Sequence, residues 1–450
     1  MENKILSSVI LCLAIFAASL VYAAADDGNS KDVSSFNSWI AQDNVTGRWG
    51  GLRDKLEKAG VTISSNYVMD INGNPAGGNN RTATYSGAFY FAGAMDFEKI
   101  ASIKGLALKV SNYLFSGQNL SADIGNFYWV QEVYANGNYY LGELDLSLSL
   151  LDDTFVFETG RLFAGDIFGV PPIAQYYLTS ALNGRLGAIP SDVFFPHYNI
   201  AAWGVRATYQ PNKEWHFIAG LYNADTSVSK TTNHGTNFNF DMDQGYLAVG
   251  QLTYKHGQDK KDMTLPGSAS FGAYYESSKF PDLSSSKIWR GNYGFYWMLD
   301  QMIYKGQWPE YEGPSHMSSS STLAERHRKP YSQQTAIPLD RPEGLTAWTG
   351  ITLAPDIHIN TQVYEIATGL IYQGLPPNRN RDVTAVCFVI GHFSEKLPGQ
   401  SDEMIVEFNH RFQLGPWFYV TPDIQYIINP NGQRNIKPAL VLGVEASLNF

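Results

Sequence analysis

The residue types that most often carry catalysis form no recognisable constellation in this sequence. The nine histidines are scattered, and none has the H-E-x-x-H spacing of a zinc site. The G-x-S-x-G nucleophile pattern and the glycine-rich phosphate patterns are absent. A lipase-like Ser, His and amide brought together only by folding stays open as an alternative. We therefore expect no enzyme activity, no metal and no cofactor, which leaves non-covalent binding.

Six charged residues lie around one long aromatic stretch, residues 163–199. Two stand at the end of the run that precedes it, three lie within it, and one follows it. Such side chains hydrogen-bond polar solutes, and in a narrow passage they bias which solutes enter. Charges on a wide water-filled surface are also ordinary, so each is a candidate only. The six candidates are Glu158, Arg161, Asp166, Arg185, Asp192 and Arg206.

Period-two alternation is the pattern that positions these residues. The segments GELDLSLSL (142–150) and EMIVEFNHRFQ (403–413) alternate apolar with polar side chains, which predicts strands with two different faces. In WGVRATYQ (203–210), Trp203 and Arg206 fall on opposite faces. We expect Arg206 inside and Trp203 in an outer aromatic girdle.

About seventeen segments alternate in this way, and many approach the roughly 9–11 residues that cross a bilayer at a tilt. Aromatic residues make up 14% and charged residues 16%, against roughly 25% charged in soluble domains. We predict an all-β fold, an antiparallel transmembrane β-barrel. Bacterial barrels have an even number of strands, so one segment is wrong and sixteen is expected. The candidate strands are 61–70, 84–98, 104–114, 127–136, 142–150, 154–162, 203–210, 215–223, 245–255, 268–276, 292–304, 346–354, 358–367, 383–392, 403–413, 416–426 and 438–450.

The N-terminus has the features of a secretory signal. A lysine, an apolar run and small residues before two aspartates predict a signal peptide over residues 1–25. A linker over 26–45 and a single barrel over 46–450 follow. After cleavage Cys387 remains, and we interpret it as a small buried or lipid-facing residue rather than a reactive thiol.

Two connections are long. The aromatic stretch 163–199 is expected to fold inward and to be ordered. The stretch 305–344 contains SSSS and many charges, and we expect it to be an exposed extracellular excursion. The chain ends on Phe450 at the close of an alternating strand, which resembles the assembly signal of outer-membrane barrels.

Three motifs resemble the carbohydrate-selective porins of the OprB family. They are GRWGGLRDKLEKAGV near the start, GLIYQGLPPNRNRDVTAVCFVIGHFSE, and FYVTPDIQYIINPNG before the last strand. Arg48 departs from the pattern, because an acidic residue is expected there. The resemblance covers about residues 46–450 and implies a sixteen-stranded outer-membrane barrel through which sugars diffuse.

A channel for sugars is expected to have Arg and carboxylate side chains that hydrogen-bond the sugar hydroxyl groups. It is also expected to have aromatic rings on which the C–H faces of the sugar can pack. The expected partners are permeating sugars, outer-membrane lipid and the barrel-assembly machinery, which would read the strand ending in Phe450. The net charge of −10 argues against nucleic acid, and monomer and homotrimer both stay open. Glu132 is expected to pair with an arginine, and Asp423 and Gln425 to fix barrel geometry. A general or anion-preferring porin and a secreted β-rich lectin are the remaining alternatives.

The stretch TGRWGGLRDKLEKAG, residues 46–60, is the segment with helical spacing. Leu52 and Leu56 share one face, and Gly60 can close the helix in the left-handed conformation. We expect a short periplasmic helix that either narrows the exit, docked through Trp49, Leu52 and Leu56, or only caps the barrel. The residues assigned to this barrel mouth are Arg48, Trp49 and Arg53.

Overall fold

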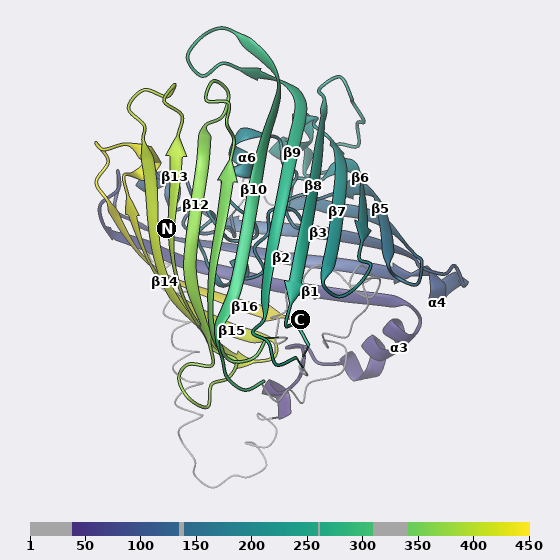
Figure 1. Cartoon of the computed structure of the whole chain (residues 1–450). Helices are drawn as coiled ribbons and strands as arrows, with labels where there is room; N and C mark the ends of the chain where they lie inside the picture. Colours follow the sequence, from purple (N-terminus) through teal and green to yellow (C-terminus); the bar gives the residue numbers. More distant parts are fainter. Residues whose placement is uncertain (1–37, 135–138, 260–261, 309–340) are drawn as a thin grey trace.

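Sixteen antiparallel strands close into one barrel (Figure 1). The computed structural model describes residues 38–450 except 135–138, 260–261 and 309–340. Each strand pairs with its neighbours in sequence, and β1 pairs with β16 to close the barrel. The predicted all-β barrel and its strand number are confirmed, while the predicted signal peptide lies outside the described residues.

The strands have the lengths and alternation that the sequence predicts, with polar residues turned inward. Their bounds are β1 Val61–Ala76, β2 Ala83–Asp96, β3 Leu106–Gly117, β4 Tyr139–Leu150, β5 Phe155–Leu162, β6 Ala202–Tyr209, β7 Trp215–Asn223, β8 Tyr246–His256, β9 Gly267–Pro281, β10 Ile288–Lys305, β11 Gly344–Leu353, β12 Gln362–Gln373, β13 Val383–Phe393, β14 Asp402–Gly415, β15 Phe418–Ile428 and β16 Ala439–Asn449.

The segment 127–136 is the candidate strand that is wrong. Its described residues belong to the connection between β3 and β4, which folds into the barrel. The backbone N–H groups of Phe127 and Tyr128 donate to the Glu403 carboxylate on the opposite wall instead of to a neighbouring strand. A side-chain acceptor thus replaces the strand ladder that the alternation suggested.

Strand parity decides at which end each connection lies. Both termini of the barrel, Val61 and Asn449, lie at one end, so every connection that follows an even-numbered strand lies there too. Short turns predominate at this end, as they do on the periplasmic side of outer-membrane barrels. The connection 306–343 follows β10, and residues 309–340, on which the expected extracellular excursion falls, lie outside the described residues.

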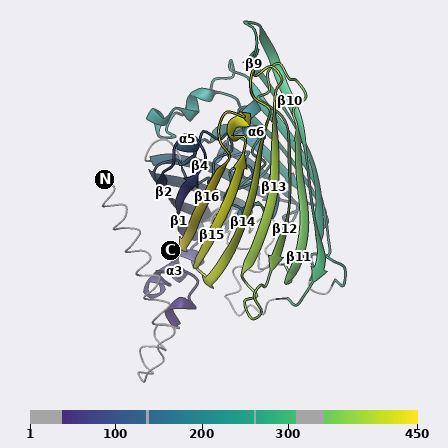
Figure 2. The same cartoon turned by 90° about the vertical axis from the view of Figure 1, so that its left-hand side faces the viewer.

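The barrel interior is filled by the described residues of two connections from the opposite end, 118–134 and 163–201. They contain the short helices α5 (Ser121–Ile124), α6 (Ile189–Asp192) and η2 (Ala174–Tyr176). Figure 2 shows the barrel from the side of β13 to β16. Leu120, Leu182 and Leu186 are fully buried in the core that these connections build inside the barrel. The inward fold predicted for the stretch 163–199 is confirmed.

The predicted N-terminal helix is present as α3 (Leu52–Lys58), preceded by the turn η1 (Trp49–Gly51). Gly60 follows it with a φ of 90°, the left-handed conformation that the sequence predicted. Arg48 bonds the carboxylates of Asp54 and Glu57 on the helix itself. The helix packs against β1.

Of the three residues predicted to dock this helix, Trp49 and Leu52 are exposed and Leu56 is half-buried. Trp49 is 36% and Leu52 is 52% exposed, whereas Arg53 is buried. Arg53 donates to the main-chain oxygen of Phe450 at 2.9 Å and lies over the Trp49 ring at 4.3 Å. The helix is therefore fastened at the junction of β1 and β16 by a cation rather than by an apolar face.

The outward faces of the strands are apolar. Phe271, Trp297 and Leu442 are each more than two-fifths exposed. None of the helices in the described part of the chain is both long and apolar enough to cross a membrane.

Candidate functional site

A network of buried charges lies on the inner wall formed by β3 to β6. Arg206 and Glu158 face each other across the β5–β6 ladder and form a bidentate ion pair with two distances of 2.7 Å. Lys109 on β3 lies 2.8 Å from Asp145 on β4 and 3.9 Å from Glu158. Arg206 also donates to the carbonyl of Phe163, where the inward connection begins, at 2.9 Å. The pair therefore joins the wall to the start of that connection.

A second group of charges lies where the two inward connections meet. Arg185 from one connection and Glu132 from the other approach to 3.9 Å, with side chains 8% and 15% exposed. The predicted pairing of Glu132 with an arginine is confirmed. Gly165 leaves room for this arrangement, because a Cβ there would lie 3.0 Å from Arg185 Cδ and 2.8 Å from His197 Cβ.

Burial and neighbouring charge set the ionisation of this second group. Burial raises the pKa of Asp166 to about 6, and the positive charges of Arg185 and Arg206 oppose that rise. Burial also raises the pKa of Glu132. Burial and the charge of Arg185 hold the pKa of His197 well below its usual range. The imidazole of His197 is therefore uncharged at neutral pH, and Asp166 loses its negative charge as the pH falls through about 6.

The structure brings four of the six sequence candidates together and places two elsewhere. Glu158, Arg206, Asp166 and Arg185 lie within one electrostatic network. Asp192, on α6, is buried and accepts a hydrogen bond from the backbone N–H of Gln362 on β12 at 3.1 Å.

Arg161 also lies apart from this network. It pairs in register with Leu144 and Trp203, and residues paired across an antiparallel ladder share a face. That face is the outer one, since Val205 and Phe157, which continue the same alternation, are exposed. The predicted opposite orientation of Trp203 and Arg206 is confirmed.

Wall carboxylates hold the longer inward connection in place. Glu407 on β14 is fully buried, and its two oxygens accept the N–H groups of Leu178 at 2.8 Å and Thr179 at 2.9 Å. Asn409, two residues further along the same strand, donates to the carbonyl of Tyr176 at 2.8 Å. One strand thereby fixes one turn of the connection through three buried side-chain atoms.

The same arrangement recurs around the wall. Glu403 accepts the N–H groups of Phe127 and Tyr128 at 2.7 and 2.9 Å, and Glu365 accepts that of Ala188 at 2.6 Å. These bonds join residues that are far apart in sequence and satisfy main-chain groups that would otherwise be buried without partners. Gln425 donates to the carbonyl of Val130 at 2.8 Å, in keeping with the structural role expected for it.

Several charged residues of the barrel interior were not among the candidates predicted from the sequence. They are Lys109, Glu143, Asp145, and the pair of Arg411 with Glu445, whose closest atoms lie 3.8 Å apart. Each stands at a polar position of an alternating strand. A charge at such a position is the signal that could have identified them.

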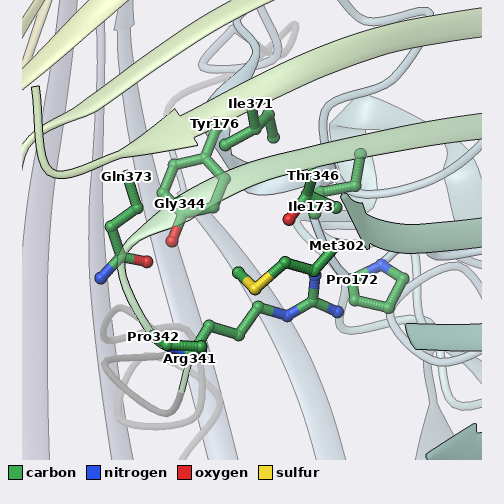
Figure 3. A pocket seen from close by; sticks show the side chains of 10 residues that line it. All are labelled: Pro172, Ile173, Tyr176, Met302, Arg341, Pro342, Gly344, Thr346, Ile371 and Gln373. Atoms are coloured by element: carbon green, nitrogen blue, oxygen red, sulfur yellow. The ribbon is translucent and has the colours of Figure 1, made fainter. Parts of the chain in front are cut away.

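A small cavity lies between the longer inward connection and the ends of β10 to β12 that face the termini (Figure 3). Its polar groups include Arg341, which pairs with Asp300, and Gln373. The residues that line it are Pro172, Ile173, Tyr176, Met302, Arg341, Pro342, Gly344, Thr346, Ile371 and Gln373.

Metal chemistry finds no support in this interior. Among the described residues, no group of three or more His, Cys, Asp or Glu side chains is arranged to hold a metal ion. Cys387 is buried on β13 opposite Glu407.

A closed sixteen-stranded barrel with an apolar outer surface and a charged interior narrowed by inward connections defines an outer-membrane porin. The model of the carbohydrate-selective porin, OprB family, matches residues 80–450, and the chain belongs to this family. It is an outer-membrane porin for carbohydrates, a channel rather than an enzyme by family and fold. The family resemblance predicted from the sequence motifs is confirmed.

Similar proteins agree in length as well as in sequence. A protein of Acinetobacter baylyi named as porin QuiX is 25% identical over 445 residues, 92% of this chain and 95% of the relative. Porin B of Pseudomonas aeruginosa is 23% identical over 444 residues, 90% and 91% of the two chains.

Two solved structures share the fold. The high pH structure of Pseudomonas putida OprB superposes with a TM-score of 0.77 at 21% identity, covering 91% of this chain and 99% of the other. The low pH structure gives a TM-score of 0.57 at 19% identity with the same coverage.

Proposed function

We propose that carbohydrates crossing this porin are bound at the meeting point of the two inward connections, by Arg185 and Glu132. The observation that carries the proposal is their partial exposure at a contact of 3.9 Å, a loose ion pair whose remaining donors and acceptors can turn to solute hydroxyls. Weak binding suits the task, because a diffusing solute must also leave.

Asp166 supports this pair from behind. It is half-buried, and its Oδ2 atom has no hydrogen-bond partner among the described residues, so its charge acts on Arg185 through space. Glu158 and Arg206 have a structural role instead. With side chains 0% and 2% exposed they reach no solute, and they brace the wall behind the site.

The cavity beside Arg341 is the exit that follows this site on the way to the periplasm. We propose that the apolar belt contacts outer-membrane lipid and that the assembly machinery reads β16 and Phe450. Monomer and homotrimer are both compatible with this pore. Cleavage of residues 1–25 and a linker over 26–45 remain proposals, as does the absence of enzyme activity.

Planar-bilayer conductance tests the sugar site. Glucose at tens of millimolar should reduce the ionic current of the native protein, and Arg185→Ala or Glu132→Gln should weaken that block several-fold. Lys104→Ala is the matched control, because this lysine side chain is 81% exposed at the periplasmic end. Current that glucose leaves unchanged in the native protein would point to a general or anion-preferring porin instead.

A further inference from the structure

The position of Arg161 is not explained by passage of solutes, because this charged side chain faces outward from a transmembrane wall. It is only 1% exposed, and no carboxylate of the described residues forms an ion pair with it. A bare guanidinium on the lipid-facing side of a barrel is destabilising. Something must therefore cover it.

The cover is part of the connection between β7 and β8, residues 234–242, here named the outer strap. Arg161 donates to the carbonyls of Gly235 and Asn237 in the strap and of Ala201 before β6. The Phe238 ring lies 5.2 Å from its guanidinium carbon. The charge is thus satisfied by main-chain dipoles and covered by an aromatic ring.

Two further contacts fix the strap to the outside of the barrel. The indole N–H of Trp203 donates to the carbonyl of Phe238 at 3.1 Å. At the other side, the N–H of Leu141 on β4 donates to the carbonyl of His234 at 2.9 Å. The strap therefore reaches from Trp203 on β6, past Arg161 at the extracellular end of β5, to the main chain of β4.

The strap turns apolar side chains away from the barrel at every second residue. Phe238, Phe240 and Met242 are 46%, 66% and 46% exposed. This apolar row continues the exposed apolar face of the wall, where Val205 and Leu221 lie on β6 and β7. The strap thus replaces a polar patch of wall with an apolar one.

We propose that the outer strap is a lipid-contacting element that lies against the hydrocarbon edge of the outer membrane, held there by Arg161. Its occupant is lipid, because its apolar row is continuous with the belt that lipid covers and Arg161 needs a cover only where water is excluded. This inference rests on the lipid contact proposed above for the belt.

Nitroxide labels in proteoliposomes of phospholipid test the strap. Phe240→Cys carries the label in the strap, with Cys387→Ser in the background to leave one thiol. Leu221→Cys reports the lipid belt, and Thr232→Cys reports an exposed polar residue of the same connection. Collision of each label with oxygen, which concentrates in lipid, is compared with collision with a water-soluble nickel chelate.

The ratio of oxygen to nickel collisions at position 240 should match that at 221 and exceed that at 232 several-fold. A ratio at 240 equal to that at 232 overturns the lipid contact. Strong coupling between labels at 240 that disappears on dilution with unlabelled protein would assign the strap to a second copy, and also overturns it. A water-exposed label at 221 would instead refute the proposed lipid belt itself.

Arg161→Gln tests how the strap is held. The shorter neutral amide cannot reach all three carbonyls, so the ratio at 240 should fall to that at 232 while the ratio at 221 stays unchanged. An unchanged ratio at 240 in a folded Arg161→Gln barrel would overturn the role of Arg161. Arg161→Lys, which keeps the charge but loses the planar group, should give an intermediate ratio.

Discussion

Replacing Glu407 by glutamine isolates the contribution of one wall carboxylate to the pore. The two side chains have nearly the same shape, so the change leaves no void. The carboxylate accepts two backbone N–H groups, those of Leu178 and Thr179, one on each oxygen. Glutamine offers one acceptor oxygen, and its NH₂ group then faces the other N–H.

The magnitude follows from that mismatch. A buried N–H left without an acceptor costs roughly 1–3 kcal/mol, and we expect the anchored connection to lose about 2 kcal/mol. Since each 1.4 kcal/mol is about tenfold, the ratio of released to anchored connection should rise about thirty-fold. The bond from Asn409 to the carbonyl of Tyr176 remains and limits the release to part of the connection.

Two assays measure this change. Single-channel recordings of Glu407→Gln should show more frequent excursions to higher conductance than the native protein, and urea unfolding should show the lower stability. Glu395→Gln, at an exposed position, is the matched control. The reasoning is refuted if Glu407→Gln has native stability and native current fluctuations.

Three further changes test other parts of the structure. Arg206→Met leaves Glu158 buried without its bidentate partner, with Lys109 at 3.9 Å as the remaining cation, and should lower the free energy of unfolding in urea by about 3 kcal/mol, whereas native stability would show that the pair does not stabilise the wall. Asp166 loses its negative charge as pH falls through about 6, so reversal potentials should show falling cation preference there, and a similar fall in Asp166→Asn would exclude this carboxyl as the cause. Arg53→Gln loses the bond to Phe450 and should cost about 1.5 kcal/mol at unchanged conductance, while a wider pore would mean that α3 narrows the exit.

Alternation allowed the barrel to be predicted because its period matches the strand itself. Every true strand was among the candidates, and Arg206 and Trp203 were assigned to their correct faces. The same rule applied from Glu158 would have turned Arg161 outward, since the two residues differ by an odd number of positions. Proximity in sequence to the long connection outweighed parity in that prediction.

The errors lie in the two inward connections, where the alternation of polar and apolar residues does not indicate the structure. The segment 127–136 alternates, but its N–H groups meet a carboxylate whose position is set only by folding. The position of Asp192 against β12 likewise depends on a bond between residues that no local pattern connects.

The hydrogen bonds that narrow this pore also constrain the order in which the barrel folds. Leu178 and Glu407 are separated by 229 positions, so their contact requires a strand made late in synthesis. Closing so long a loop is entropically unfavourable until the intervening wall exists. The contacts that narrow the pore can therefore form only once most of the wall between them is in place.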